Sequence, residues 1–315
     1  MMGRVFAGSR EPSPTASPAS KALASAAPIP RDLDPEAKLK LGLVELERGN
    51  PVAAAEWIEG AIAGDPHIAE YHSRLGNIRE LLRQLDDATI AYRRAVDLEP
   101  RSAQCHFDLG AVLEKLEVFD VAGISFENAL RLDPNHALAH YHLGRCLLAL
   151  GDANNAIVKF ERAVFFDPGL ALAHRDLGRA FVRIGAGKTA ITCFKRAVEL
   201  APQLPEVHFA LGRLYAGQGR WPDAVDALRV ALALDPRHPE NWKELGNALG
   251  ECDESGESME ICHRLGRDPS GIARVSAAVF RGLLNLKRTG DPASQIRAIR
   301  ELLVQAWIQR CEAEI

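Results

Sequence analysis

The chain has 315 residues, of which 47% are hydrophobic and 25% are charged, a balance typical of a soluble protein that buries a core. Its 38 basic and 42 acidic side chains leave a formal net charge of -4, so no overall positive field favours nucleic acid as a partner. The lack of a long apolar run argues against a transmembrane helix, and the six cysteines contain no Cys-x-x-Cys pair, so we expect a cytoplasmic protein with reduced thiols.

Residues 1–34 are predicted to form a disordered tail. More than half of the segment 1–30 is Ala, Pro or Ser, and the prolines interrupt any helix early. A secretory signal needs a compact apolar stretch behind a positive start, but Arg10, Lys21 and Pro28 interrupt that stretch. The acid-poor segment also has some character of an organelle transit peptide, although its prolines spoil an amphipathic helix. We therefore favour a flexible tail.

A Leu-Gly step recurs along the chain at a constant interval, which is the sign of a repeat architecture. The seven steps are Leu41-Gly42, Leu75-Gly76, Leu109-Gly110, Leu143-Gly144, Leu177-Gly178, Leu211-Gly212 and Leu245-Gly246, so the sequence has a 34-residue period. Twelve residues after each of the first six glycines comes an alanine, seven residues further a second alanine, and five residues further a proline. The three series are Ala54, Ala88, Ala122, Ala156, Ala190 and Ala224; Ala61, Ala95, Ala129, Ala163, Ala197 and Ala231; and Pro66, Pro100, Pro134, Pro168, Pro202 and Pro236. The seventh unit departs from them with Ser258, Leu265 and Ser270.

Each unit is predicted to be a helical hairpin. Apolar residues recur at three- and four-residue spacing on both sides of a short break such as Gly151-Asp152 or Gly217-Gln218-Gly219. The small Gly and Ala side chains allow the helix axes to approach closely, and the closing proline ends the second helix. The predicted units are 35–68, 69–102, 103–136, 137–170, 171–204, 205–238 and a degenerate 239–272. Because one hairpin cannot bury its apolar face alone, the units are predicted to stack in series as an all-α solenoid.

The Leu-Gly step, the two alanines, an aromatic residue such as Phe126, Phe160 or Phe194 and the closing proline, at this period, resemble the tetratricopeptide repeat (TPR) family. The resemblance covers about residues 35–250. It implies a right-handed α-solenoid of about seven helix hairpins. Residues 273–315 are predicted to form amphipathic helices that cap the open end of the stack, because an exposed terminal apolar face lowers solubility.

A ladder of five histidines invites a metal-binding interpretation. They stand three residues before the leucines, at His72, His106, His140, His174 and His208, and Trp242 takes the same place in the seventh unit. Equivalent helices are separated by another helix, and packed helix axes lie about 8–10 Å apart, whereas metal ligands lie near 2 Å from the ion. We therefore expect these side chains to pack, with no metal.

Two further patterns are expected to be turns. Gly185-Ala186-Gly187-Lys188-Thr189 ends like a phosphate-binding loop, but Val182 stands where that motif needs its first glycine. The carboxylate pair Asp86-Asp87 also falls at a predicted inter-helix turn. No other catalytic or cofactor signature is found, so we expect no enzyme activity, no catalytic residues and no cofactor.

The first helix of each unit carries the residues of a predicted ligand-binding face. Residues two before the leucine and one after the glycine are four apart and share a helix face; the family resemblance implies that this face lines a concave groove. The predicted peptide-binding residues are Tyr141, Arg145, Arg175, Arg179, Arg183, Phe209, Arg213, Lys243 and Asn247. Because guanidinium groups bind carboxylates in a bidentate manner, we expect an extended peptide bearing Asp, Glu or a free carboxy terminus. Asp108 and Asp176 on nearby turns would temper the charge of this face. The alternative is that its arginines are merely solvated.

These features predict a non-enzymatic scaffold or adaptor whose partner is a protein or peptide. The alternative is a substrate-recognition arm, because the chain also resembles the repeat region that precedes the catalytic part of protein O-linked N-acetylglucosamine transferases; no transferase domain follows residue 272. A third interpretation is self-association through the carboxy-terminal helices.

Overall fold

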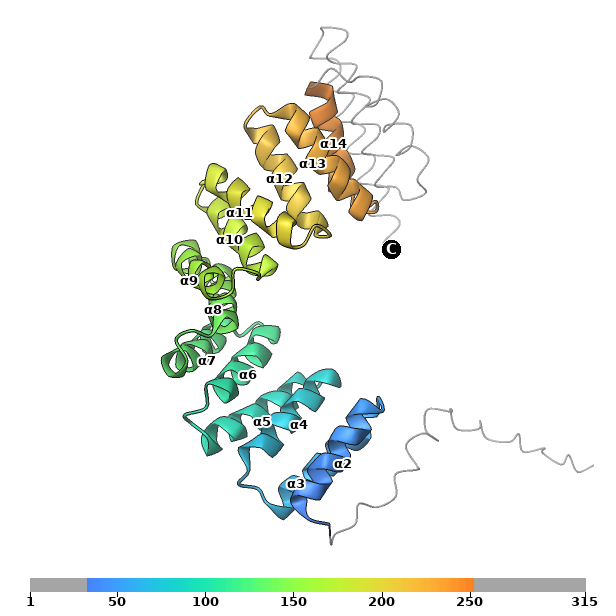
Figure 1. Ribbon diagram of the computed structural model, residues 1–315, viewed down its shortest axis with the longest axis vertical. Coiled ribbons are helices and arrows are strands. Elements are labelled where there is room, and N and C mark those ends of the chain that lie inside the picture. Colours follow the sequence, from blue (N-terminus) through green and yellow to red (C-terminus); the bar gives the residue numbers. More distant parts are fainter. Residues whose placement is uncertain (1–32, 252–315) are drawn as a thin grey trace, which may run out of the picture. The chain divides into compact units, whose positions relative to one another are not determined.

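The computed structural model describes residues 33–251, and in this range the chain forms 13 α-helices and no strand. The helices belong to two compact units, the first ending at Val118 and the second beginning at Phe119 (Figure 1). Unit 1 contains α2 (Pro35–Glu47), α3 (Pro51–Gly64), α4 (Ala69–Leu81), α5 (Leu85–Leu98) and α6 (Ala103–Lys115). Unit 2 contains α7 (Phe119–Leu132), α8 (Ala137–Ala149), α9 (Ala153–Phe166), α10 (Ala171–Arg183), α11 (Gly187–Leu200), α12 (Pro205–Gly217), α13 (Trp221–Leu234) and α14 (Pro239–Glu251).

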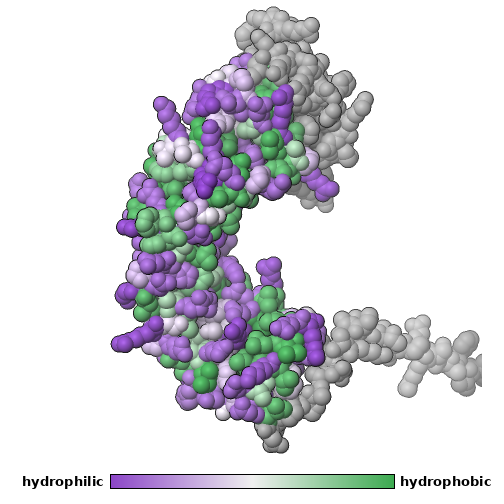
Figure 2. Space-filling model, viewed as in Figure 1, coloured by the Kyte–Doolittle hydropathy of each residue, from purple (hydrophilic) through white to green (hydrophobic). Residues whose placement is uncertain are grey.

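Three of the predicted segments fall outside the described residues. They are almost all of the amino-terminal tail, most of the seventh repeat, and the capping helices predicted within 273–315. On the face of the molecule shown in Figure 2, hydrophilic and hydrophobic residues are interspersed over the described helices. None of these helices combines the length and the apolar character that crossing a bilayer requires.

The helices pack as serial hairpins. In unit 1, α2 packs on α3 and α4 on α5; in unit 2, α8 packs on α9, α10 on α11 and α12 on α13. Each second helix then packs on the first helix of the next hairpin, as α3 does on α4 and α11 on α12. The described first helices share one length and the described second helices share another, longer by a single residue. The predicted all-α solenoid of stacked hairpins is therefore confirmed.

Close contact inside each hairpin explains the glycine of the Leu-Gly step. A Cβ atom added to Gly178 would lie only 2.7 Å from Cε1 of Phe194 on the partner helix. The same addition at Gly76 would lie 2.5 Å from Cε1 of Tyr92. Both aromatic rings are almost completely buried, so they have little room to move away. A small residue is needed here, as the sequence predicts.

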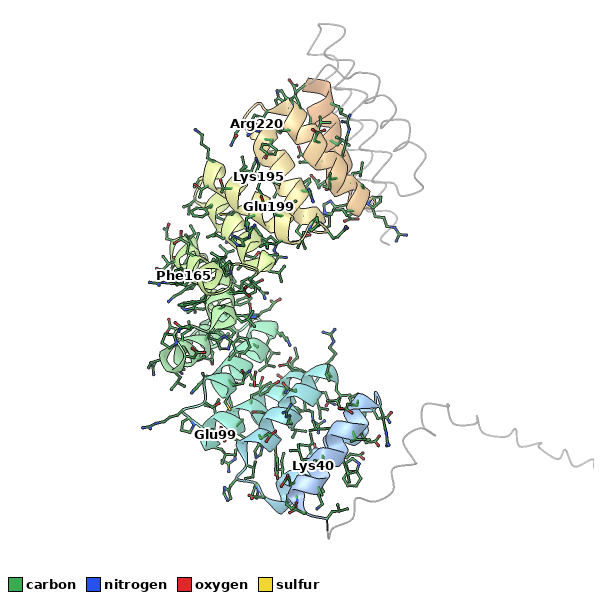
Figure 3. The ribbon with its side chains drawn as sticks, in the orientation of Figure 1. Lys40, Glu99, Phe165, Lys195, Glu199 and Arg220 are labelled. Carbon is green, nitrogen blue, oxygen red and sulfur yellow. The ribbon has the colours of Figure 1, made fainter. Side chains whose placement is uncertain are left out.

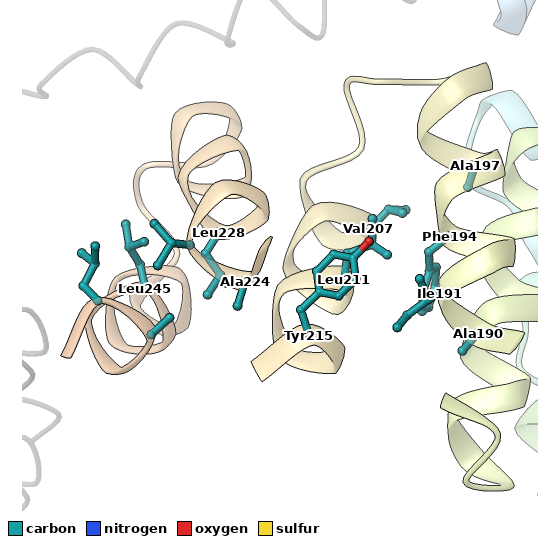
Figure 4. Close-up of a cluster of buried hydrophobic side chains, with 13 residues drawn as sticks. Ala190, Ile191, Phe194, Ala197, Val207, Leu211, Tyr215, Ala224, Leu228 and Leu245 are labelled. Carbon is teal, nitrogen blue, oxygen red and sulfur yellow. The ribbon is translucent and has the colours of Figure 1, made fainter. Parts of the chain in front are cut away.

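The core combines small buried alanines with large buried side chains of the second helices, such as Tyr92, Phe160 and Phe194. The twelve periodic alanines of the second helices are all fully buried. Figure 4 shows one such cluster in unit 2, where Phe194 and Ile191 of α11 face Val207 and Leu211 of α12. Leu228 of α13 belongs to the same cluster, so the core is continuous from one hairpin to the next.

The turns inside the hairpins repeat one backbone conformation. A residue with a left-handed φ, between 61° and 89°, occurs once in each hairpin turn, at Gly49, Arg83, Glu117, Gly151, Gly185 and Gly219. Gly185 and Ala186 therefore lie in an inter-helix turn, as predicted, but Gly187 already begins α11, so Lys188 and Thr189 lie in the first turn of that helix and not in the predicted turn.

Four carboxylates that the sequence singles out lie within helices, and two of them are not where they were expected. Asp86 and Asp87 lie in the first turn of helix α5, because Gln84 already caps its start. An acidic residue is favoured there by the helix dipole. Asp108 lies within α6 and Asp176 within α10, one residue before the leucine of the repeat, which is the middle of the first helix. The prediction that Asp86 and Asp87 occupy the inter-helix turn was therefore wrong by two or three residues, whereas Asp176 tempers the charge of Arg175 and Arg179 as expected.

Candidate functional site

The predicted peptide-binding residues all lie on the first helices of unit 2. Tyr141 and Arg145 are on α8; Arg175, Arg179 and Arg183 are on α10; Phe209 and Arg213 are on α12; and Lys243 and Asn247 are on α14. We call this set the first-helix face. Six of its side chains are exposed: Arg145, Arg179, Arg183, Arg213, Lys243 and Asn247.

Two arginines of the face lie over an aromatic ring one helical turn earlier. The guanidinium carbon of Arg145 is 5.7 Å from the centre of the Tyr141 ring. Arg213 has the same relation to Phe209, at 5.9 Å. These cation–π contacts hold the aliphatic part of each arginine against the helix while its guanidinium group reaches solvent. The recurring i, i+4 spacing of aromatic residue and arginine thus places a guanidinium group over a ring in the same way on α8 and on α12.

Between these two arginines, α10 carries a buried ionic cluster around Asp176. The side chain of Asp176 is 3% exposed. Its Oδ2 accepts a hydrogen bond of 3.0 Å from the Tyr141 hydroxyl and one of 3.1 Å from Nη2 of Arg175. Its Oδ1 accepts bonds from Nε of Arg175 at 3.0 Å and from Nη1 of Arg179 at 3.3 Å. Nη1 of Arg175 also donates to Glu206 of α12 at 3.1 Å. The cluster therefore joins side chains of three first helices.

This cluster changes which charges are presented to a ligand. Arg175 is only 19% exposed and is neutralised by Asp176 and Glu206. Burial opposes its charge, but the bonds to Asp176 outweigh this and raise the pKa of the guanidinium group. Burial, with the nearby charge of Asp176, raises the pKa of the Tyr141 hydroxyl to about 12, so it remains a donor. Tyr141 and Arg175 thus support the face, whereas Arg179, 59% exposed, still reaches solvent.

The remaining predicted residues are more loosely connected. Nη1 of Arg183 donates to the carbonyl oxygen of Leu148 at 2.9 Å, near the end of α8, where a cation is favoured by the helix dipole. Lys243 forms an exposed ion pair with Glu240 at 3.5 Å. Asn247 is exposed on the same helix, and no contact of it with the arginines is found among the described residues. The structure joins the residues of α8 to those of α10 through Asp176, and Glu206 links Arg175 to α12. Among the described residues, Phe209 and Arg213 are paired with each other on α12, and the residues of α14 stand apart.

Asp176 was expected from the sequence only to temper the charge of the arginines, and its contact with Tyr141 was missed. The sequence shows it beside Arg175, but it does not show that Tyr141, in the preceding repeat, meets it across two helices. The available signal was the position of Asp176 inside a first helix, one residue before a core leucine. A carboxylate at such a position needs a partner because burial of an unpaired charge is costly.

The five periodic histidines have a structural role. In each case Nε2 lies 2.9–3.3 Å from the carbonyl oxygen of the proline six residues earlier. Since a carbonyl only accepts, Nε2 must carry the hydrogen. Each imidazole therefore ties the start of a first helix to the loop before it. Within residues 33–251 no group of three His, Cys, Asp or Glu side chains is arranged to hold a metal.

The second helices carry a separate set of exposed side chains, among them Phe165 of α9 and Lys195 of α11 (Figure 3). Phe165 is 71% exposed, and its ring meets that of Phe166 edge-on at 5.2 Å. These side chains are not part of the first-helix face.

Comparison with known families gives one consistent result. Two family models, both described as tetratricopeptide repeat, match residues 15–69, 107–171 and 175–239 in one case and residues 69–102 in the other. A search of curated proteins finds no match to this chain.

Solved structures with the same arrangement of helices include PilF of Pseudomonas aeruginosa, which has a TM-score of 0.59 and 20% sequence identity. The matched region covers 67% of this chain and 96% of the PilF chain. YrrB, described as a TPR protein with an unusual peptide-binding site, has a TM-score of 0.51 and 24% identity, covering 58% of this chain and 95% of that one. A MamA fragment from Desulfovibrio magneticus RS-1 also has a TM-score of 0.51 and 24% identity, with coverage of 53% and 94%. At these identities the likeness concerns the fold.

Proposed function

Because this chain belongs to the tetratricopeptide repeat family, we propose that it is a non-enzymatic interaction scaffold that binds an extended acidic peptide along the first-helix face of unit 2. The observation that carries the proposal is the recurrence of an exposed arginine at one repeat position, as Arg145, Arg179 and Arg213. One arginine per first helix offers evenly repeated partners to carboxylates along an extended chain.

The buried cluster supports this proposal and refines it. Asp176 and Glu206 neutralise Arg175, so this arginine orients its neighbours and is not itself expected to bind the peptide. Arg145 and Arg213 are exposed, and each lies over an aromatic ring that orients the guanidinium group. Because Arg179 shares the charge of Asp176, we expect a weaker contribution from it than from Arg213.

The first prediction tests this face with a charge reversal. The variant Arg145→Glu/Arg179→Glu/Arg213→Glu should bind an acidic peptide, selected from a peptide array on the full chain, about ten-fold or more weakly than the wild type. Fluorescence anisotropy of the labelled peptide measures the change. The melting temperature should fall moderately, because Arg179→Glu removes a hydrogen bond to the buried Asp176 and places a second carboxylate near it, whereas the charges of Arg145 and Arg213 are exposed. Wild-type binding should also weaken as salt is added.

A matched control is available on the second helices. Arg162→Glu/Lys188→Glu/Lys195→Glu makes the same change in net charge at exposed positions of α9 and α11. It should leave the affinity within about two-fold, because these residues lie off the first-helix face. If this control weakened binding as much as the test variant, attraction by net charge alone would account for it and the proposed face would be wrong.

The substrate-arm alternative predicts the same peptide contacts but a different consequence. On that interpretation the bound peptide is presented to a separate N-acetylglucosamine transferase. Adding that enzyme would then lead to faster modification of the peptide in the presence of this chain, whereas a simple scaffold would leave the rate unchanged.

A further inference from the structure

Unit 1 contains a cavity whose lining includes no residue of the first-helix face. Its volume is about 440 Å³, and it lies between the second helices α3 and α5, with α4 beneath. This is within the size range of ligand pockets, about 300–1,000 Å³. Its apolar lining consists of Ile62, Leu75, Ile90 and Ala91. We call this site the α3–α5 groove.

The groove uncovers a position that is buried in all later described repeats, although Leu41 of the first repeat is 38% exposed. Leu75 is the leucine of a Leu-Gly step and is only partly buried, whereas Leu143 and Leu245 at the same position of unit 2 are each 2% exposed. Ile90 on the rim is 68% exposed, and the neighbouring Ala91 contributes only a methyl group to the wall. An apolar side chain placed between α3 and α5 would remove Leu75 and Ile90 from water, which is favourable by the hydrophobic effect.

The charges around the groove are of two kinds. Arg79 is satisfied, because it pairs with Glu59 across α3 and α4 and donates to Gln84 at 2.6 Å. Asp87 and Arg94, both on α5 and both exposed, form no ion pair within the described part of the chain. They are seven residues apart, about 10.5 Å along the helix, and Ile90 lies between them. The groove therefore has an unpaired acid near one end and an unpaired base near the other.

We propose that the α3–α5 groove binds an amphipathic helix of a partner protein that carries one basic and one acidic residue two turns apart. A helix lying along α5 repeats the same axial spacing, so its basic residue can face Asp87 while its acidic residue faces Arg94. The apolar side chains between them then contact Leu75 and Ile90, which is the helix-in-groove mode of recognition. This site is distinct from the face proposed above, and either can exist without the other.

The experiment uses synthetic helical peptides as probes on the full chain. Three labelled 18-residue peptides share one stripe of leucines. They differ only at two flanking positions, seven residues apart, which carry Lys and Glu in the first probe, Glu and Glu in the second, and Gln and Gln in the third. Fluorescence anisotropy should show the Lys/Glu probe binding about five-fold more tightly than the Gln/Gln probe. Asp87→Lys should reverse the preference, so that the Glu/Glu probe binds best.

The apolar contact is tested by Ile90→Glu, which should weaken binding of the Lys/Glu probe about ten-fold. The matched control is Ile124→Glu, since Ile124 stands at the same repeat position on α7 and is 59% exposed; it should leave binding unchanged. Circular dichroism should show that both variants keep their helices, because both positions are exposed.

Three results would overturn the proposal. The first is that Ile90→Glu binds the Lys/Glu probe as tightly as the wild type. The second is that Ile90→Glu and Ile124→Glu lose the same amount of affinity for this probe. The third is that Asp87→Lys still prefers the Lys/Glu probe to the Glu/Glu probe. If light scattering instead shows a smaller particle mass for the Ile90→Glu variant than for the wild-type chain, the groove is occupied by a second copy of this chain and the partner assignment is wrong.

Discussion

At the scale of the residue, the glycine of each Leu-Gly step is required by contact across the hairpin. The ring of Phe194 occupies the space where a Cβ of residue 178 would lie, and Phe160 does the same at Gly144. Both rings are buried, so the contact cannot be relieved by moving a flexible side chain.

The second prediction follows from this contact. Gly178→Val should lower the free energy of unfolding by about 2 kcal/mol, since overpacking of a core costs about 1–3 kcal/mol. Urea denaturation followed by circular dichroism measures it. Gly217→Val is the control, because a Cβ at Gly217 meets nothing within 4 Å. Equal losses in both variants would point to helix propensity and not to the ring contact.

The periodic histidines also act at the residue scale, and they give stability a pH dependence. Burial lowers the pKa of His140 and His174, although the bond to the proline carbonyl opposes this effect. In the unfolded chain a histidine has a pKa near 6.5. Between the lowered value and about 6.5, the unfolded state binds more protons, so stability rises with pH in this window.

The third prediction is that the stabilising effect of His140 is complete above about pH 6.5 and decreases as the pH falls toward its lowered pKa. His140→Gln keeps a side-chain N–H donor for Pro134 but has no titrating group. Its unfolding free energy, measured by urea denaturation at pH 7.5 and pH 5.5, should therefore change less than that of the wild type. An identical pH effect in the two proteins would rule out a contribution from His140.

At the scale of the element, Asp176 holds neighbouring first helices in position. It accepts bonds from α8 and from two arginines of its own helix, while Arg175 also reaches Glu206 on α12. Breaking a buried ion pair from one side is costly because the other charge stays behind without its partner.

The fourth prediction is that Asp176→Ala lowers the free energy of unfolding by about 3 kcal/mol, while Tyr141→Phe, which removes one neutral donor, costs about 1 kcal/mol. Asp226→Ala is the matched control, because Asp226 is 80% exposed and its pair with Arg229 is 3.6 Å long. It should change stability by less than about 0.5 kcal/mol. A loss in Asp176→Ala no larger than in the control would show that the cluster does not stabilise the fold.

At the scale of the whole molecule, each hairpin contacts mainly its neighbours, so the repeat is the unit of stability. The second helices α9 and α11 are each followed by a first helix with the same Leu-Gly step. A deletion of one full period therefore keeps every helix in register with an equivalent partner, whereas a deletion of half a period does not.

The fifth prediction compares two internal deletions. Removing residues 171–204 should leave a chain that unfolds cooperatively, with similar helix content per residue and lower total stability. Removing only residues 171–187 takes away α10 and leaves α11 without its hairpin partner. This shorter deletion should lose more helix per residue by circular dichroism. A half-period variant as helical as the full-period variant would contradict the repeat as the unit of folding.

The sequence alone determined the family, the length of the repeat and the places where each helix meets its partner. It could do so because hairpin packing is local: the Leu-Gly step, the buried alanines and the proline act within one unit, and their 34-residue period is visible in the chain. Only the tertiary structure decided which charges reach solvent. Tyr141 and Asp176 come from different repeats, and Leu75 is uncovered beside Asp87 and Arg94, because burial and ion pairing depend on how helices of successive hairpins pack against one another.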